Sequence, residues 1–151
     1  MAKSNKTFTF DDLNNELANL NPMGSVMEMS DFSEITEYLD TGNYHLNACV
    51  SGSLFKGWPN NRACSVAGPS GTGKTFLMLN TVREAIEKGY SVIYYDSEAA
   101  IDKELMKKFG IDISKVNYQP VNTVQEFRTS VTTITKKMQE AKRNGAELPK
   151  V

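Results

Sequence analysis

The chain has 151 residues, about the length of one domain, and its 23% of charged residues leave a net charge of −1. This balance excludes a protein that binds nucleic acid through its overall charge, so any such surface must be local or absent. No apolar run approaches the length of a membrane span and the N-terminus lacks the apolar core of a signal peptide, so we expect a soluble, cytoplasmic protein without membrane contact.

The two cysteines, Cys49 and Cys64, show neither metal-ligand spacing nor the density of a disulfide framework. This usage favours a reducing cytoplasm. We expect both to be small core residues.

The first predicted element is a short helix near the N-terminus. Thr9 and Asp12 have the spacing of a capping box, which begins a helix. Asn21-Pro22 ends the helix, because proline cannot continue it. The apolar side chains form one narrow stripe made of Leu13, Leu17 and Leu20.

Several short segments lead from this helix to the centre of the chain. Residues 21–30 are rich in turn residues and methionine and are predicted to be a linker. Apolar residues at helical spacing predict a second helix from about Asp31 to Leu39, followed by a turn at residues 40–43. Residues 44–62 hold too many turn residues for a long element, so we expect a structured loop. The single histidine, His45, has no metal-ligand neighbour at suitable spacing and is interpreted as a surface residue.

The most informative stretch follows this loop and fits the pattern G-x-x-x-x-G-K-[ST] at every fixed position. It consists of Gly68, Pro69, Ser70, Gly71, Thr72, Gly73, Lys74 and Thr75. Before it, residues 64–67 are predicted to form a buried strand, and after it apolar residues recur at helical spacing up to Gly89. A loop that joins a strand to a helix is the context of a nucleotide phosphate loop.

The residue types in this loop suit a nucleoside triphosphate with Mg²⁺. Glycines let consecutive backbone N–H groups turn toward phosphate oxygens, and the start of the next helix adds unpaired N–H groups and a positive dipole end. Lys74 is predicted to reach the β and γ phosphates, and Thr75 to offer its hydroxyl to Mg²⁺. The alternative is a glycine- and serine-rich turn with an incidental lysine.

The rest of the chain alternates strands and helices. Residues 91–95 and 115–118 are predicted strands, and Asp102 can cap the helix that lies between them and ends at Gly110. Thr123 and Glu126 form a capping box that opens a long helix, whose apolar residues are expected to pack in the core. Leu148 to Val151 resemble the first residues of another strand. This alternation predicts an α/β fold with a parallel sheet covered by helices.

The segment Asp96-Ser97-Glu98 follows the strand after the loop. Because ligands bind beyond the carboxyl ends of strands in open α/β sheets, these acids are expected at the same edge as the phosphates. Glu98 is therefore a candidate general base that orients or deprotonates the water attacking the γ phosphate. A solvated acidic turn is the alternative, and the spacing alone leaves both interpretations open.

Together, these motifs resemble the ATPase core of the RecA recombinases, and more closely the UvsX-type recombinases of tailed phages. The resemblance runs from about residue 41 to 143. Besides the loop, it rests on Thr41-Gly42, Leu46-Asn47, Ser51-Gly52-Ser53, Gly57, Pro59, Arg62, Tyr95 to Asp102 and Phe109 to Asp112.

The resemblance implies a P-loop NTPase fold with a RecA-like parallel sheet and flanking helices, incomplete at the C-terminus. Residues 1–40 would be an N-terminal helical and oligomerisation segment, and residues 41–151 the N-terminal part of the ATPase core. In the family, the glutamate matching Glu98 activates the hydrolytic water, and the aspartate matching Asp102 lies near the adenine. The aromatic residue expected three positions later is Leu105 here, which puts base stacking in doubt.

The family's functions extend beyond this chain. Its members bind ATP and Mg²⁺, polymerise on single-stranded DNA as helical homo-oligomeric filaments and exchange strands in recombination and repair. The Walker B aspartate and the DNA-binding loops would lie beyond Val151, so we expect the nucleotide-binding half of a DNA-dependent ATPase, inactive alone and marginally stable. A phage-encoded protein would act in the host cytoplasm. The alternatives are a hexameric replicative helicase and a non-catalytic ATP-binding or filament-interaction fragment.

Overall fold

The computed structural model describes residues 8–21, 24–29 and 34–151, and the chain divides into two compact units, Met1–Thr36 and Glu37–Val151. We describe each unit by itself. None of the helices formed by the described residues is both long and apolar enough to cross a bilayer.

The N-terminal unit contains the predicted first helix, α1 (Phe10–Leu20). Its capping box is confirmed: the Thr9 N–H donates to Asp12 Oδ2 at 2.9 Å and the Asp12 N–H donates to Thr9 Oγ1 at 3.2 Å. No residue of α1 is buried, and Leu20 is 82% exposed. The predicted linker contains one turn of 3₁₀ helix, η1 (Met27–Met29).

The second unit begins with a strand where the sequence predicts a helix. Residues 31–33 of that helix lie outside the described residues, but 34–37 are not helical and β1 (Tyr38–Leu39) pairs antiparallel with β2 (Trp58–Pro59). The helix prediction is wrong over this part, because pairing with a distant segment outweighs a short apolar periodicity.

The predicted loop at 44–62 is also wrong in its first half, where α2 (Tyr44–Ser51) forms. Asn43 caps this helix at its start and Gly52, in the left-handed region at φ +75°, ends it. The cap residues were interpreted as turns, although they mark the two ends of a short helix. His45 lies exposed on α2, as expected.

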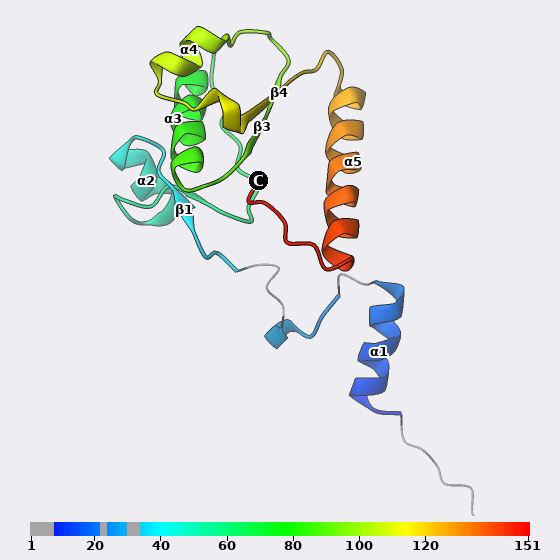
Figure 1. The fold of residues 1–151 in the computed structure, drawn as a ribbon. Helices are drawn as coiled ribbons and strands as arrows, with labels where there is room; N and C mark the ends of the chain where they lie inside the picture. Colours follow the sequence, from blue (N-terminus) through cyan, green and yellow to red (C-terminus); the bar gives the residue numbers. More distant parts are fainter. Residues whose placement is uncertain (1–7, 22–23, 30–33) are drawn as a thin grey trace, which may run out of the picture. The chain divides into compact units, whose positions relative to one another are not determined.

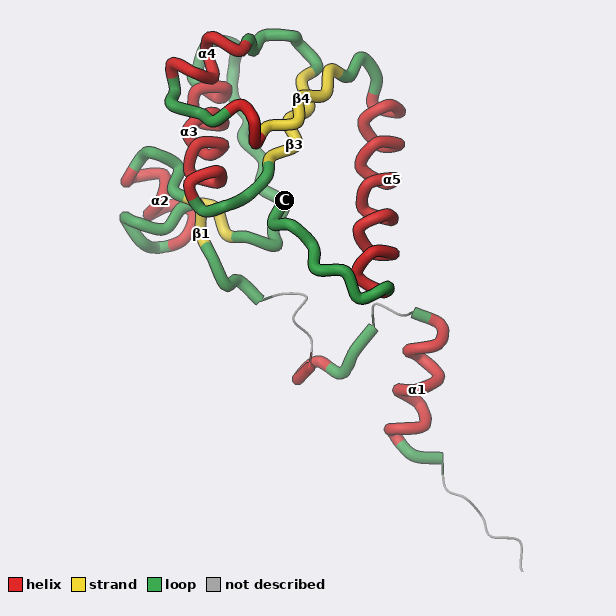
Figure 2. The backbone as a smooth tube through the Cα atoms, viewed as in Figure 1, coloured by secondary structure: helices red, strands yellow, loops and turns green. Residues whose placement is uncertain are grey.

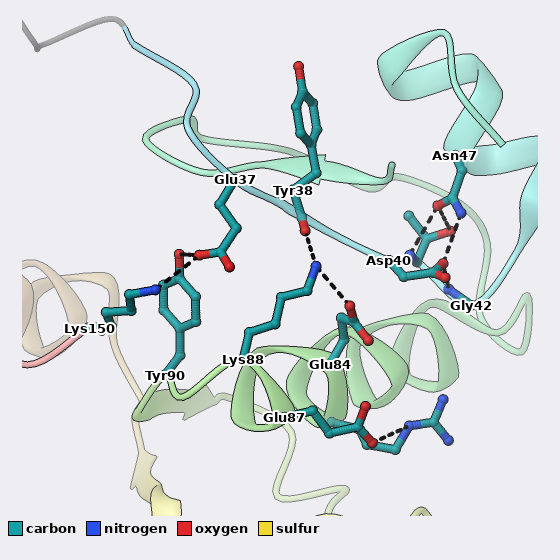
Figure 3. A network of polar contacts seen from close by, with 12 residues as sticks. Glu37, Tyr38, Asp40, Gly42, Asn47, Glu84, Glu87, Lys88, Tyr90 and Lys150 are labelled. Carbon is teal, nitrogen blue, oxygen red and sulfur yellow. Dashed lines mark hydrogen bonds and ion pairs between the residues drawn. The ribbon is translucent and has the colours of Figure 1, made fainter. Parts of the chain in front are cut away.

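A buried amide holds α2 against the turn before it. Asn47 and Thr41 are fully buried, and Asn47 Oδ1 accepts from the Thr41 N–H at 3.1 Å and from the Thr41 hydroxyl at 2.8 Å. Asn47 Nδ2 donates to Asp40 Oδ1 at 2.9 Å (Figure 3). It also donates to the Leu54 carbonyl at 2.9 Å. The Asn47 carbonyl oxygen thus accepts two hydrogen bonds and its amide nitrogen donates two, so the side chain fixes α2 relative to the preceding turn.

Helices cover a parallel pair of strands in the remainder of the unit (Figure 1). The helices and strands of this part, in chain order, are α3 (Lys74–Glu87), β3 (Val92–Asp96), α4 (Lys103–Lys108), η3 (Ile113–Lys115), β4 (Val116–Pro120) and α5 (Val124–Arg143). β3 and β4 run side by side with Val92 opposite Val116 (Figure 2). This arrangement confirms the predicted α/β class, the two strands and the capping box of α5.

Side chains on one face of β3 pack against α3 and α4. Leu79 and Val82 of α3, Met106 of α4 and Ile111 form the buried cluster, and Tyr94 lies against it. Tyr95, the next residue of β3, points to the opposite face because side chains alternate along a strand. There its ring packs edge-to-face against the Phe127 ring of α5, with 5.0 Å between the ring centroids.

α5 is less buried than the sequence predicts. None of its residues is buried, and Val124 is 76% exposed. Its described contacts to the strands include the Tyr95–Phe127 ring pair and a hydrogen bond between the Tyr95 and Ser130 hydroxyls at 2.8 Å. The expectation of core packing is wrong, because two strands offer too little surface to cover one face of a long helix.

Residues 64–67 are not the buried strand that the sequence predicts. They are exposed and form no strand within the described part of the chain. An apolar run forms a buried strand only beside a hydrogen-bonding neighbour, and β3 pairs instead with β4. Cys49 and Cys64 are both exposed and free, so their assignment to the core is also wrong.

The C-terminal residues return to the beginning of β3. Leu148 to Val151 form no strand, but the Lys150 carbonyl accepts a hydrogen bond from the Ser91 N–H at 2.8 Å. The Lys150 ammonium lies 3.4 Å from Glu37 Oε2, which also accepts from the Tyr90 hydroxyl at 2.7 Å (Figure 3). Glu37 thereby links the start and the end of this unit.

Candidate functional site

Residues 68–73 form a tight turn that leads into α3, which begins with Lys74 and Thr75. Gly71 and Gly73 have φ values of +77° and +87°, a region that glycine enters without steric cost. Gly73 is the N-cap of α3, and no side-chain hydrogen bond caps this helix start. The first N–H groups of α3 are therefore available to an anion.

Lys74 lies across the loop. Its ammonium donates to the carbonyls of Gly68 and Pro69, both at 2.8 Å, and the Thr72 hydroxyl donates to the Pro69 carbonyl at 2.9 Å. These contacts hold the Lys74 ammonium group against the carbonyls of the turn. An anion at the start of α3 would attract the same ammonium group away from two neutral carbonyls.

The loop and the end of β3 enclose one open cavity of about 660 Å³. Residues 70–75 form one wall, and residues 94–98 with Ala100 and Ile101 form the other. The structure thus brings the predicted phosphate loop and the predicted acidic segment to the same cavity. This volume lies within the range of about 300–1,000 Å³ that small-molecule sites occupy.

Glu98 lies in the turn after β3 and lines this cavity. Its side chain is exposed, and its N–H donates to Asp96 Oδ1 at 2.9 Å. A carboxylate at this place can accept a proton or orient a water molecule beside a bound anion.

Asp102 lies outside the residues that line this cavity. It is the N-cap of α4, and its Oδ1 accepts from the Leu105 N–H at 2.7 Å. This is the capping role that the sequence predicts for Asp102. Leu105, which occupies the position expected for an aromatic residue, packs against the core cluster.

The structure adds two residues whose contact the sequence did not predict. Asp96 is 8% exposed at the end of β3, and its Oδ2 accepts from the Tyr118 hydroxyl of β4 at 3.1 Å. Burial alone would raise the pKa of Asp96, but hydrogen bonds from the Glu98 N–H, Tyr118 and the N–H groups of Ile101 and Ala99 outweigh it and lower that pKa. Burial and then the hydrogen bond to Asp96 raise the pKa of Tyr118. The parallel register of β3 and β4 brings Asp96 and Tyr118 together, and no local spacing in the sequence indicates this contact.

The donor groups around the cavity fit a nucleotide phosphate with a divalent cation. The helix start and Lys74 suit phosphate oxygens. The Thr75 hydroxyl and the exposed Glu98 carboxylate line the cavity, and Mg²⁺ prefers such oxygen ligands together with substrate phosphates. Among the described residues, no group of three or more His, Cys, Asp or Glu side chains could hold a metal alone.

Comparison with known proteins decides the family. The family model described as the RecA N-terminal domain matches residues 12–136. The chain belongs to the RecA family. Protein RecA of Streptomyces coelicolor is 38% identical over 104 residues, which are 68% of this chain and 27% of that relative.

Other members of the RecA family match comparable stretches. Protein RecA of Bacteroides thetaiotaomicron is 33% identical over 62% of this chain and 28% of its own length. Protein RecA of Lactobacillus acidophilus is 29% identical over 83% of this chain and 34% of its own length. The chain therefore spans about a third or less of the curated relatives it matches.

Proposed function

We propose that this chain is the nucleotide-binding part of an ATP-dependent recombinase, with the P-loop NTPase core of its family. The observation that carries the proposal is the cavity that residues 70–75 and the end of β3 line together. We further propose the UvsX type of tailed phages, on the motifs quoted above, with residues 1–40 as an oligomerisation segment and 41–151 as part of the core.

The proposed binding step uses the loop and the start of α3. Backbone N–H groups of residues 70–73 surround the phosphates, and the Lys74 ammonium leaves the Gly68 and Pro69 carbonyls to pair with the β and γ phosphates. Thr75 would hold Mg²⁺, which when bound neutralises charge on the phosphates. Asp102 remains a proposed contact to the adenine.

The proposed reaction is hydrolysis of the γ phosphate. Water attacks the γ phosphorus while the bond from that phosphorus to the bridging oxygen breaks, and ADP leaves with the bond's electrons. Glu98 orients the water and accepts its proton. Lys74 stabilises the charge that develops on the transferred group.

The proposed partners follow from the family and not from surfaces of this chain. They are single-stranded DNA and further copies of the same protein in a helical filament. The proposed location is a reducing cytoplasm. Four basic residues lie near the end of α5 and are interpreted most simply as a solvated face that suits the helix dipole, with a basic contact surface as the alternative: Lys136, Lys137, Lys142 and Arg143.

Nucleotide binding by the 151-residue chain tests the first half of the proposal. A fluorescent ATP analogue is titrated with Mg²⁺ into the wild type, Lys74→Ala and Lys107→Ala, the last an exposed lysine of α4 outside the cavity. Loss of one charge-assisted contact predicts about 10- to 100-fold weaker binding for Lys74→Ala alone. Equal affinity in all three proteins would contradict the proposed site.

Phosphate release with and without single-stranded DNA tests the second half. We expect no turnover by the isolated chain, and DNA-stimulated turnover when it is joined to the rest of a RecA core. In that joined protein, Glu98→Gln should bind ATP as the wild type does and stop hydrolysis. Unchanged turnover would remove Glu98 as the base, and binding without turnover in the joined wild type would favour a non-catalytic module.

A further inference from the structure

The turn that carries Glu98 is closed by one buried carboxylate. Asp96 Oδ1 accepts from the Glu98 N–H at 2.9 Å. This hydrogen bond closes the turn directly after the end of β3. The turn is built around this residue.

The same turn contains a strained residue. Ala99 has a φ of +50°, in the left-handed region that is unfavourable for a residue with a Cβ. Such a conformation persists only where the surroundings hold it in place. The hydrogen bond from the neighbouring Glu98 N–H to Asp96 supplies that constraint.

The second oxygen of Asp96 is held from the neighbouring strand. Tyr118 Oη donates to Asp96 Oδ2 at 3.1 Å, and the Tyr118 ring stacks on Tyr94 at 6.5 Å between centroids. Tyr118 lies opposite Tyr94 in the parallel register, which aims its hydroxyl at the end of β3. Both carboxylate oxygens are therefore engaged, although Asp96 lines the cavity.

We propose that Asp96 and Tyr118 are positioning residues for Glu98: Tyr118 holds the Asp96 carboxylate, and that carboxylate holds the turn that places Glu98 at the cavity. The role of Glu98 in this statement rests on the proposed function. Asp96 acts as a fixed acceptor and not as a second base, because its oxygens are occupied by hydrogen bonds. β4 thereby contributes to the site without touching the nucleotide.

Amide hydrogen exchange followed by NMR on the 151-residue chain tests the positioning without nucleotide. In Tyr118→Phe, which keeps the ring, the Glu98 amide should exchange about tenfold faster, as expected for losing one hydrogen bond to a charged acceptor. Asp96→Asn should have a larger effect on the same amide.

Tyr90→Phe is the matched control. It removes a tyrosine–carboxylate hydrogen bond of the same kind, to Glu37, at the other end of β3 (Figure 3). Exchange in the 98–101 turn should stay as in the wild type. If Asp96→Asn does not fold, Tyr118→Phe decides alone, and unchanged exchange in it would overturn the proposal.

The catalytic consequence is tested in the chain joined to the rest of a RecA core. Tyr118→Phe should lower kcat for ATP about tenfold and leave KM within about twofold, while Tyr90→Phe should leave both unchanged. Equal kcat values in the two variants would overturn the link to Glu98. Absence of turnover in the wild type would instead refute the proposed function, and amide exchange would still decide whether Asp96 and Tyr118 hold the turn.

Discussion

Replacing Asn47 by alanine is the sharpest test of how the second unit is held together. The change removes the acceptor of the buried Thr41 N–H and the donor to the Leu54 carbonyl. The Thr41 hydroxyl keeps a partner in the Asn43 carbonyl at 3.1 Å, and Asp40 still accepts from the Gly42 N–H. The Thr41 N–H and the Leu54 carbonyl therefore lose the hydrogen-bond partner that Asn47 supplies.

The expected cost follows from these two groups. A buried polar group left without a partner costs about 1–3 kcal/mol, so Asn47→Ala should lose about 3–5 kcal/mol of unfolding free energy. A domain of this kind has about 5–15 kcal/mol in total. The variant should therefore lie close to the limit of folding.

Urea unfolding measures this loss, with the single tryptophan as the probe. Trp58 Nε1 donates to Thr81 Oγ1 at 2.9 Å, so its fluorescence reports on contact between β2 and α3. With a slope of about 2 kcal/mol/M, the midpoint should fall by about 2 M. The whole-chain wild type and the variant are compared in the same buffer.

Asn43→Ala on the same helix is the control. Asn43 is an exposed N-cap whose Oδ1 accepts from the Leu46 N–H at 3.0 Å, and losing such a cap costs about 1 kcal/mol. If Asn47→Ala is no less stable than Asn43→Ala, the reasoning from buried unpaired groups is refuted.

Three further outcomes are expected. Gly57→Ala should lose about 3 kcal/mol in the same assay, since its Cβ would meet the Leu39 carbonyl and lie 2.7 Å from Asn47 Oδ1; a loss below about 1 kcal/mol would refute this clash. Thr123→Ala should lose about 1 kcal/mol and some helical circular dichroism by removing the capping box of α5, and unchanged stability would show that this cap is dispensable. Burial raises the pKa of Asp96, but its hydrogen bonds outweigh burial and lower that pKa overall. The ionised Asp96 carboxylate therefore stabilises the fold above about pH 4, and this stabilisation is lost as the pH falls. Asp96→Asn should therefore lose less stability than the wild type between about pH 5 and pH 2, and parallel curves would contradict the assignment.

Local chemistry explains the predictions that the structure confirms. A capping box depends on residues three apart, so Thr9 with Asp12 and Thr123 with Glu126 could be identified without any tertiary information. The turn from Gly68 to Thr75 likewise depends on glycines at φ values that other residues avoid. The sequence predicted the shared cavity of this loop and Glu98 from strands that end at a common edge. The structure shows the cavity although residues 64–67 form no strand, because α3, which follows the loop, packs against β3.

The failed predictions concern burial and pairing. The sequence of residues 64–67 suits a buried strand, yet the segment is exposed, because a strand requires a neighbour that no local pattern specifies. α5 has the periodicity of a core helix, but its apolar face meets only a narrow pair of strands. Hydrophobic pattern indicates which face can be buried and not whether another surface covers it.

The sequence by itself determined the phosphate-loop motif and the capping boxes of α1 and α5, since each depends on residues a few positions apart. It also indicated the α/β class through the alternation of strand and helix patterns along the chain. Only the tertiary structure decided the contacts between distant residues. Asp96 meets Tyr118 through the register of two strands, and Trp58 of β2 meets Thr81 of α3. These contacts depend on how the elements pack, and packing depends on the whole chain at once and not on any local spacing.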